Sequence, residues 1–327
     1  MKALVYTRPH ELVFQDAPDP KVGDLGTDTL IKVDAVGICG SDMHAFLGHD
    51  DRRPAPLILG HEAAGVTTEG RRVTVNPLVT CGECRHCLAG QDNLCETRQI
   101  ISMPPREGAF AEWLIMPERN LVTVPDDISL TKASLAEPIA CGWHAVRIGR
   151  GRLQGEAASA RVLVIGGGAI GVGAALSASA QGFKDITLVE PNDLRRSYLE
   201  GKLDFAVMHP ENLGAGGQFD LIIDGVGYEG TRAMASQQAV PGGVIMHIGL
   251  GSGEGGLDIR RLTLQEITFI GTYTYTDKDF RDTAAAIFDG KLGALDWIEE
   301  RPLSDGNQSF HDIRSGQVPA PKIILKP

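Results

Sequence analysis

The sequence has no excess of basic residues: 31 Lys and Arg stand against 42 Asp and Glu in 327 residues, giving a formal charge of −11. That charge would repel phosphate backbones and anionic lipid surfaces, which argues against a general nucleic-acid or membrane-surface binder. The 40 glycines follow no three-residue period, which excludes collagen, and no repeat or low-complexity tract is visible. Cysteine is absent after residue 141, and four of the six cysteines crowd into residues 81–95.

Long apolar runs are also missing. The N-terminal segment has no apolar stretch suited to a signal peptide, so we expect a cytoplasmic, reducing location. Val162–Phe183 is free of charge, but consecutive glycines at 166–168 follow a strand-length apolar run, so a buried strand that turns into a helix explains it better than a membrane span. The length and the 43% hydrophobic content indicate about two globular domains.

The first part of the chain is typical of a β domain. Short strands separated by Pro- and Gly-containing turns are expected at Lys2–Tyr6, Leu12–Gln15, Thr29–Val36, Arg72–Val75, Ala111–Met116 and Asn120–Val124. Strands without intervening helices favour a Greek-key or barrel arrangement. A helix at Glu137–Ile148 and a glycine-rich connector at 149–159 follow.

From residue 161 strands alternate with helices. We expect strands at Arg161–Ile165, Asp185–Glu190, Phe205–Met208, Asp220–Asp224, Gly243–Ile248 and Ile267–Ile270, with helices at Ala169–Gln181, Leu194–Leu199 and Thr231–Ala239. Such alternation predicts a parallel sheet covered by helices on both faces, so the fold class is α/β with two domains. A helix at Asp282–Asp289 and a strand at Lys322–Leu325 are too short to fold alone and should pack back onto the N-terminal domain.

Four cysteines form a C-x2-C-x2-C-x7-C pattern: Cys81, Cys84, Cys87 and Cys95. Three closely spaced thiolates on a tight loop can converge, and a fourth closes a tetrahedron, which is typical of structural Zn²⁺. An iron–sulfur cluster and a pair of disulfides are the alternatives, although the spacing differs from known cluster motifs and a reducing location disfavours disulfides.

Further metal-ligand types recur at long range in three short motifs. Cys39 lies in Gly-Ile-Cys-Gly-Ser-Asp-Met-His, His61 and Glu62 lie in Gly-His-Glu-Ala-Ala-Gly, and Glu137 precedes a proline. Each motif alone is weak, because a lone Cys or His is usually a packing residue. Together they suggest a mixed thiolate, imidazole and carboxylate site.

A G-x-G-x-x-G motif follows the predicted strand Arg161–Ile165 and opens a helix, the context of a dinucleotide site. The residues expected to contact the cofactor there are Gly166, Gly168, Ala169, Ile170 and Gly171, the helix N-terminus supplying N–H groups for the phosphates. Glu190 ends the next strand, where a carboxylate can bind both ribose hydroxyls and repel a 2′-phosphate, which favours NAD. Arg195 leaves NADP open, because a guanidinium can pair with that phosphate.

The order of these motifs along nearly the whole chain resembles the zinc-dependent medium-chain alcohol/polyol dehydrogenases, closest to the sorbitol, threonine and sugar-acid dehydrogenase branch. The resemblance implies a GroES-like β-barrel catalytic domain at 1–145 and 282–327, a structural zinc lobe at about 77–100, and a Rossmann NAD-binding domain at 146–281. It also implies two Zn²⁺ per chain, a small-molecule alcohol or polyol substrate, and a homodimer or homotetramer, the edge strand Ile267–Ile270 being one candidate contact.

The resemblance further implies a role for each residue of the open site. Cys39 and His61 become catalytic zinc ligands, and Glu62 and Glu137 share the carboxylate position, one bound directly and the other through water or in exchange. Asp42 would orient the zinc-bound histidine, Ser41 and His44 would form a proton relay, and Cys141 would only pack.

The function expected is reversible hydride transfer between NAD and a secondary alcohol that belongs to a polyol, sugar or sugar acid. An aldehyde or ketone reductase on the same scaffold and a non-catalytic nicotinamide-binding protein are the alternatives. Ala45 and Thr274 stand where sorbitol-type relatives carry hydrogen-bonding Tyr and Arg side chains, so sorbitol itself is disfavoured. Phe110 and Trp113 would line the substrate pocket or pack in the core.

Overall fold

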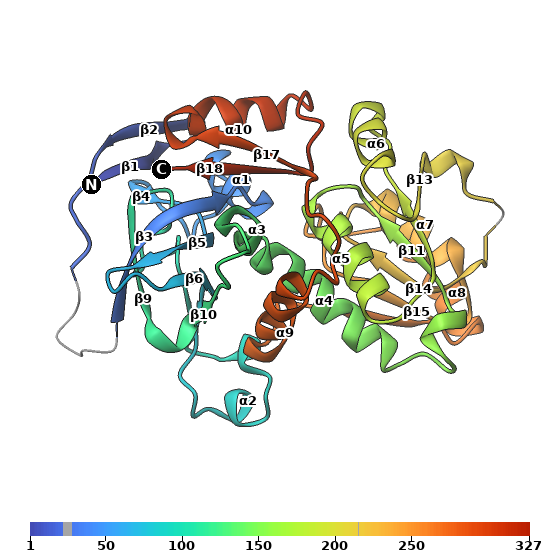
Figure 1. The fold of residues 1–327 in the computed structure, drawn as a ribbon. Helices are drawn as coiled ribbons and strands as arrows, with labels where there is room; N and C mark the ends of the chain where they lie inside the picture. The colour runs from blue at the N-terminus through green and yellow to red at the C-terminus, as the bar shows by residue number, and fades with distance from the viewer. Residues whose placement is uncertain (22–27, 215) are drawn as a thin grey trace. The chain divides into compact units, whose positions relative to one another are not determined.

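The computed structural model describes residues 1–21, 28–214 and 216–327, which fold into two compact units (Figure 1). The first unit comprises residues 1–137, 276–289 and 298–327, and the second comprises residues 138–275 and 290–297. The boundaries predicted at 145 and 282 differ from these limits by eight and six residues, and residues 290–297, predicted in the first domain, lie in the second unit. Within the described ranges, no helix combines the length and apolar character needed to cross a membrane.

The first unit is built mainly from strands. Its strands are β1 Lys2–Arg8, β2 Glu11–Asp16, β3 Asp28–Gly37, β4 Leu57–Ile58, β5 Glu62–Thr67, β6 Arg72–Val75, β7 Leu78–Val79, β8 Gln99–Ile100, β9 Trp113–Pro117, β10 Leu121–Thr123, β17 Ile298–Pro302 and β18 Lys322–Lys326. Its helices are α1 Gly40–Phe46, α2 Arg85–Leu88, α3 Leu130–Ser134, α9 Asp277–Phe288, α10 Gly306–Arg314 and the 3₁₀ turns η1 Asp92–Leu94, η2 Glu118–Asn120 and η5 Leu303–Asp305. Helix α4, Ala136–Arg150, begins in this unit and continues in the second.

Strand β3 organises the first unit. Its sheet runs β10-β6-β5-β3-β18-β17, with β9 also paired to β3, and all pairs are antiparallel except β17–β18. The pairing of β18 with β3 confirms that the C-terminal segment packs back onto the N-terminal strands. At its carboxyl end, β3 places Gly37 opposite Glu62 on one side and opposite Ile324 on the other. The residues that follow Gly37 are thus held between two neighbouring strands.

Strand β5 was not predicted, because its sequence Glu-Ala-Ala-Gly-Val-Thr has low strand propensity. The structure shows why small residues are needed: a Cβ atom on Gly65 would lie 2.2 Å from the carbonyl oxygen of Lys32. The two backbones approach closely at this point, and tertiary packing determines the strand where local propensity does not.

The second unit alternates strands and helices, as predicted. Its strands are β11 Arg161–Ile165, β12 Asp185–Val189, β13 Ala206–Met208, β14 Phe219–Asp224, β15 Ala239–His247 and β16 Thr268–Gly271. Its helices are α5 Ala169–Ala180, α6 Asp193–Glu200, α7 Glu229–Gln238, α8 Ile259–Leu264 and the 3₁₀ turns η3 Ala157–Ser159 and η4 Pro210–Asn212.

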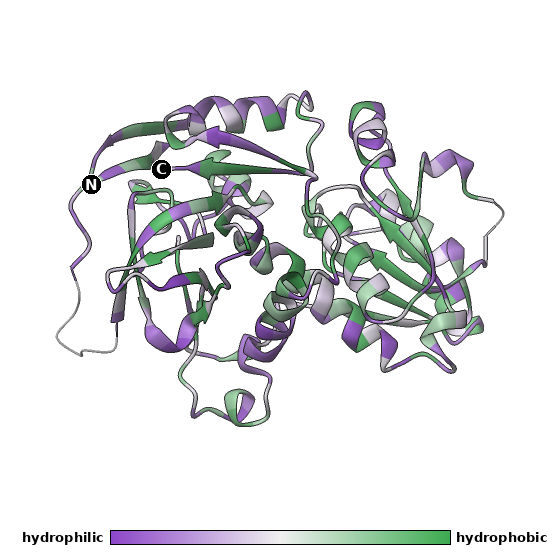
Figure 2. Ribbon diagram, viewed as in Figure 1, coloured by the Kyte–Doolittle hydropathy of each residue, from purple (hydrophilic) through white to green (hydrophobic). Residues whose placement is uncertain are grey.

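All strands of this second sheet are parallel, in the order β13-β12-β11-β14-β15-β16. Numbered within the unit, this is the 3-2-1-4-5-6 order of a doubly wound sheet, so the α/β prediction is confirmed. The apolar strands appear green in Figure 2, and the side chains of the central strands β11, β12 and β14 are mostly buried, as expected for strands with helices on both faces. In such a sheet ligands bind at the carboxyl ends of the strands, where β11 meets the glycine motif.

Candidate metal centre and cofactor site

Three predicted ligands of the open metal site are brought together. Cys39, His61 and Glu62 each offer one ligand atom, and these atoms all lie within 4.8 Å of one another. Cys39 follows β3 and Glu62 begins β5, so the register of the two strands creates the group. One thiolate, one imidazole nitrogen and one carboxylate oxygen, with a position left for a further ligand, form a donor set suited to catalytic zinc.

Asp42 fixes the geometry around the group. Its carboxylate accepts N–H bonds from Cys39 (3.0 Å) and Gly60 (3.2 Å), the residues at and just before the two ligand positions. The Oδ1 atom of Asp42 also lies 3.5 Å from His61 Nδ1. A carboxylate at this nitrogen leaves Nε2 as the metal-binding atom of the ring. The structure thus places Asp42 where the predicted orienting acid should be.

The charges of these groups stabilise one another. Burial acts to raise the pKa of Asp42, but His61, Arg53 and the Cys39 N–H lower it below its ordinary value. Burial acts to lower the pKa of His61, but Asp42 and the Cys39 thiolate raise it well above its ordinary value. The anions that favour a proton on this ring would also favour a cation bound at Nε2.

Glu62 takes part in a buried ion pair. Its Oε1 atom accepts a hydrogen bond of 2.6 Å from Lys322 Nζ, which also donates to the Ile38 carbonyl at 2.7 Å. The side chains of Glu62 and Lys322 are 1% and 3% exposed. Burial acts to lower the pKa of Lys322, but the charges of Glu62, Cys39 and Glu137 raise it. Lys322 opens the apolar strand β18 and was not predicted as a site residue.

The second oxygen of Glu62 is available to a metal. Oε2 is buried and has no hydrogen-bond partner among the described residues. A Cβ atom on Gly37 would lie 1.9 Å from it, so only glycine leaves room for this carboxylate. A buried carboxylate oxygen left unsatisfied is costly, and a cation bound there would remove that cost. The residues present therefore fit a zinc ion.

The remaining predicted site residues differ in how they lie relative to the three grouped ligands. Ser41 Oγ lies 3.5 Å from His61 Nε2, beside the three ligands. Glu137 is buried in the first turn of α4, where it influences Lys322, but it is not one of the three grouped ligands. His44 is exposed at the last turn of α1, and Cys141 lies outside both ligand groups of the described chain.

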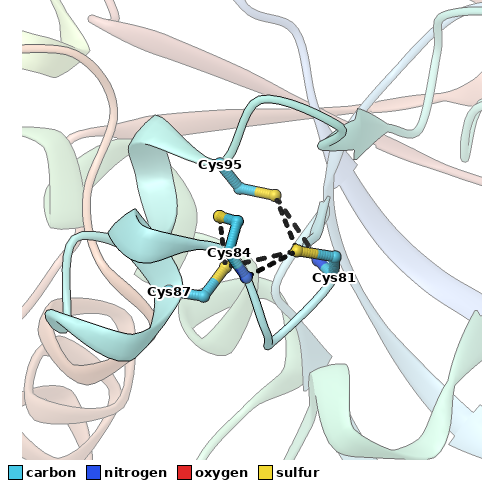
Figure 3. Close-up of side chains that lie close together, drawn as sticks. All are labelled: Cys81, Cys84, Cys87 and Cys95. Atoms are coloured by element: carbon cyan, nitrogen blue, oxygen red, sulfur yellow. Dashed lines mark hydrogen bonds between the residues drawn. The ribbon is translucent and has the colours of Figure 1, made fainter.

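The four-cysteine group converges as predicted. Figure 3 shows Cys81, Cys84, Cys87 and Cys95 gathered in one place, with ligand atoms within 4.8 Å of one another. Neighbouring sulfur atoms lie 3.5–3.9 Å apart, and all four cysteines are free thiols. The alternative of two disulfides is therefore not formed. This spacing suits one tetrahedral ion with four thiolate ligands.

The thiols of this lobe differ in acidity. The N–H groups of Glu83 and Cys84 lower the pKa of Cys81 to about 6, whereas burial raises the pKa of Cys87 to about 12. Because zinc binds cysteine as the thiolate, metal binding at this lobe releases the remaining thiol protons and its affinity depends on pH.

The glycine motif forms the turn between β11 and α5. Gly166 has φ +101°, and a Cβ atom on Gly171 would lie 1.8 Å from the Gly166 carbonyl oxygen, so both positions require glycine. Gly168 is the N-cap of α5, and a Cβ there would meet nothing within 4 Å. The first N–H groups of a helix have no intrahelical partner, so this open turn can receive a pyrophosphate.

Glu190 follows β12 and lies against this turn. Its oxygens accept N–H bonds of 2.8 Å from Gly167 and from Asn192, and its side chain is 7% exposed. Arg195 Nη1 lies 3.9 Å from Glu190 Oε2, and Arg195 Nε is buried with no partner in the described part of the chain. An acid and a guanidinium thus meet at the place where an adenosine ribose is expected.

Three residues near the metal group were missed in the sequence: Lys322, Arg53 and Ser102. Each is buried, and each reaches the group from a segment without a motif. The only signal for Lys322 was a charge at the head of the apolar run Ile323–Leu325. Phe110, considered for the substrate pocket, is fully buried and packs against Gly60 instead.

Comparison with known proteins agrees with the two candidate metal-ligand groups and the glycine turn described above. Residues 26–126 match the family model described as alcohol dehydrogenase GroES-like domain, and residues 169–289 match zinc-binding dehydrogenase. L-Galactonate-5-dehydrogenase of Escherichia coli is 31% identical over 90% of this chain and 89% of its own length. Probable D-xylulose reductase A of Neosartorya fischeri is 28% identical over 94% and 92%. The structure of acetophenone reductase from Geotrichum candidum with NAD is 25% identical, with a TM-score of 0.87 and coverage of 100% and 97%.

The two units, the mixed ligand group at Cys39 and the four-cysteine group together define a zinc-binding dehydrogenase. The chain belongs to the zinc-dependent medium-chain alcohol/polyol dehydrogenase family. The predicted combination of a GroES-like unit and a Rossmann-type sheet is confirmed. The protein is a zinc-dependent alcohol oxidoreductase that works with a nicotinamide cofactor.

We predict that Lys322→Met destabilises the metal-free protein by about 3–5 kcal/mol, because it leaves Glu62 buried without its counter-ion. The free energy of unfolding in urea measures this loss. Lys326→Met is the matched control on the same strand: its partner Asp34 is 45% exposed, so a loss within about 1 kcal/mol is expected. Equal losses of stability in the two variants would contradict the role of Lys322 as the buried counter-ion of Glu62.

Proposed function

We propose that the protein catalyses reversible hydride transfer between NAD and a secondary alcohol of a polyol, sugar or sugar acid. The observation that carries the proposal is the group of Cys39, His61 and Glu62, in which Oε2 of Glu62 is buried without a hydrogen-bond partner among the described residues. The names of the relatives support the substrate class, since one is a dehydrogenase of a sugar acid and another a reductase of a ketose.

Cys39, His61 and Glu62 are the residues that would hold the catalytic zinc. Glu62 is favoured as the direct carboxylate ligand because it belongs to the group, and Glu137 takes the exchanging or water-linked role. When bound, zinc supplies Lewis acidity that polarises the substrate oxygen and favours loss of its proton. Cys81, Cys84, Cys87 and Cys95 would hold the second, structural zinc.

The proton is handled by side chains of α1. Ser41 Oγ, 3.5 Å from His61 Nε2, would accept the hydroxyl proton of the substrate while its own hydroxyl proton moves on through the cofactor ribose toward the exposed His44, which would release a proton to solvent. Asp42 keeps the His61 ring oriented while the proton moves. Ala45 is buried in α1 and offers no hydrogen bond to a long polyol, which supports a substrate other than sorbitol.

NAD is the proposed cofactor, bound at the turn Gly166–Gly171 with Glu190 on the adenosine ribose. A carboxylate can accept more than the two N–H bonds that Glu190 already holds, so ribose hydroxyls can share its oxygens. The same negative charge would repel the 2′-phosphate of NADP. Arg195 is the group that would tolerate that phosphate once the carboxylate is removed.

The proposal also includes a cytoplasmic location and assembly into a homo-oligomer. The five cysteines assigned to metals bind only as reduced thiolates, which supports a reducing compartment. Strand β16 is an edge of the parallel sheet, and the preceding segment exposes Leu250, Ile259 and Leu264 at 79%, 63% and 65%. A second copy of the chain would cover such an edge and its apolar neighbours.

A spectrophotometric screen tests the reaction directly. Pentitols, hexitols, sugar acids, amino alcohols and simple secondary alcohols are offered with NAD and with NADP, and the matching ketones with the reduced cofactors. We expect the highest kcat/KM for a polyol or sugar acid with NAD. Turnover confined to ketone reduction would instead indicate the reductase function, and absence of turnover in zinc-loaded protein would contradict both.

Cys39→Ser is predicted to lower bound zinc from two ions to one and to abolish turnover, because it removes the thiolate from the open site. NAD binding, followed by cofactor fluorescence, should be retained. Cys141→Ser, a thiol lost outside both ligand groups, is the control and should keep two zinc ions and full activity. Near-normal turnover in zinc-loaded Cys39→Ser would overturn the assignment of Cys39 as a ligand of the catalytic zinc.

Glu190→Ala is predicted to lower kcat/KM for NAD about tenfold, the value expected when a hydrogen-bonded charged group is lost. The ratio of NADP to NAD activity should rise, because repulsion of the 2′-phosphate disappears while Arg195 remains. Initial rates with both cofactors measure this. The double variant Glu190→Ala/Arg195→Ala should lose the rise in NADP activity. An unchanged ratio of NADP to NAD activity in Glu190→Ala would argue against binding of the adenosine ribose by Glu190.

A further inference from the structure

Ser102 is a buried serine in an unfavourable backbone conformation. Five described residues other than glycine have left-handed φ: His10, Ser102, Glu266, Thr274 and Leu295. Of these, Ser102 (φ +67°) is the polar residue with no exposed surface. Such a conformation is unfavourable for a residue that has a Cβ atom, and glycine would adopt it without strain. A serine side chain at this position therefore calls for a compensating role.

The hydroxyl of Ser102 is directed at a proposed metal ligand. Its Oγ atom lies 3.4 Å from His61 Nδ1, and Asp42 Oδ1 lies 3.5 Å from the same nitrogen. When Nε2 binds a metal, Nδ1 carries the proton of the neutral ring and donates it. Two acceptors from different segments of the chain then surround one N–H group. One acceptor selects the tautomer, and a second restricts the rotation of the ring.

The backbone of Ser102 is itself held. Its carbonyl accepts a hydrogen bond of 3.0 Å from Nε of Arg53, whose side chain is 2% exposed. Arg53 Nη1 forms a 2.5 Å ion pair with Asp50. Burial acts to raise the pKa of Asp50, but Arg52 and Arg53 lower it to about 2, so this anchor keeps its charge near neutral pH.

Ser102 also continues directly from the four-cysteine lobe. Strand β7 leads into Cys81, and β8 returns from Cys95, the two pairing as Leu78 with Ile100 and Val79 with Gln99. Ile101 N–H then donates to the Pro77 carbonyl at 3.4 Å, one residue before Ser102. The strand that leaves the lobe thus delivers Ser102 to His61.

We propose that Ser102 is a positioning residue for His61, fixed by the ribbon β7–β8 of the lobe and by Arg53. The lobe thereby orients a ligand of the catalytic zinc in addition to closing its own site. This role rests on the proposed function in one respect, the assignment of His61 as a zinc ligand.

Ser102→Gly tests the role without adding strain, because glycine keeps the left-handed backbone and removes only the hydroxymethyl group. Zinc affinity is measured by competition with a chelating indicator, and the catalytic class of site is identified as the one missing in Cys39→Ser. We expect catalytic-site affinity to fall about tenfold, as for other partners that orient a metal ligand, with lobe affinity unchanged. The melting temperature should stay the same or rise.

Ser102→Ala separates the hydroxyl from the backbone. It should lose the same affinity as Ser102→Gly but be less stable, because alanine keeps the unfavourable φ. With ¹¹³Cd in both sites, the resonance of the site with one thiolate should shift or broaden in both variants, and the four-thiolate resonance should not. Ser309→Ala is the control, because it removes a fully buried hydroxyl bonded to the Asp305 carbonyl. It should change neither the zinc affinity of the catalytic site nor the two ¹¹³Cd resonances.

The outcomes distinguish the two proposals. If wild-type protein binds zinc only in the lobe, the proposed catalytic site fails and the role of Ser102 fails with it. If wild-type protein shows both classes of site and Ser102→Gly keeps its catalytic-site affinity within twofold, the role of Ser102 alone is overturned.

Discussion

Burial of charge at the carboxyl end of β3 is the constraint on which the first unit depends. Asp42, Glu62 and Lys322 are almost completely removed from water, and an unpaired ion in such a place costs several kcal/mol. Each charge must therefore meet a partner supplied by another strand or helix. The register that places Gly37 between Glu62 and Ile324 satisfies this requirement, since a one-residue slip would separate the carboxylate from the ammonium group.

The same charges account for the metal that the site would hold. Cys39, Glu62 and Glu137 bring three negative charges, and Lys322 brings one positive charge that all three reinforce. A divalent cation makes the formal sum zero. Lys322 thus lets the centre include both carboxylates without becoming anionic, which would weaken a Lewis acid. The lobe is built on a different principle, because four cysteine side chains, with no carboxylate or imidazole among them, converge on one position.

Sequence motifs singled out residues that the structure brings together, but they did not reveal the contacts that support those residues. Cys39, His61, the four lobe cysteines and the glycine turn could be predicted as candidates because each needs a particular residue type at a short spacing. Lys322 and Ser102 were missed because their role depends on strand pairing and on a left-handed backbone, which no local pattern records. Strand β5 was missed for a related reason, since its small residues are required by a neighbouring backbone rather than favoured by propensity. The parallel sheet was predicted because its apolar strands and helices alternate at lengths that local composition reveals.

Strand β18 has a consequence for how the centre is assembled during synthesis. Lys322 follows Glu62 by 260 residues, so Cys39, His61 and Glu62 leave the ribosome long before their buried counter-ion exists. At the 5–20 residues added per second, that interval is on the order of 13–50 seconds. Through this time the nascent β3–β5 pair carries an uncompensated carboxylate, which favours an open, hydrated arrangement. Closure of the centre is therefore expected to be among the last steps of folding, after the parallel sheet of the second unit has been made.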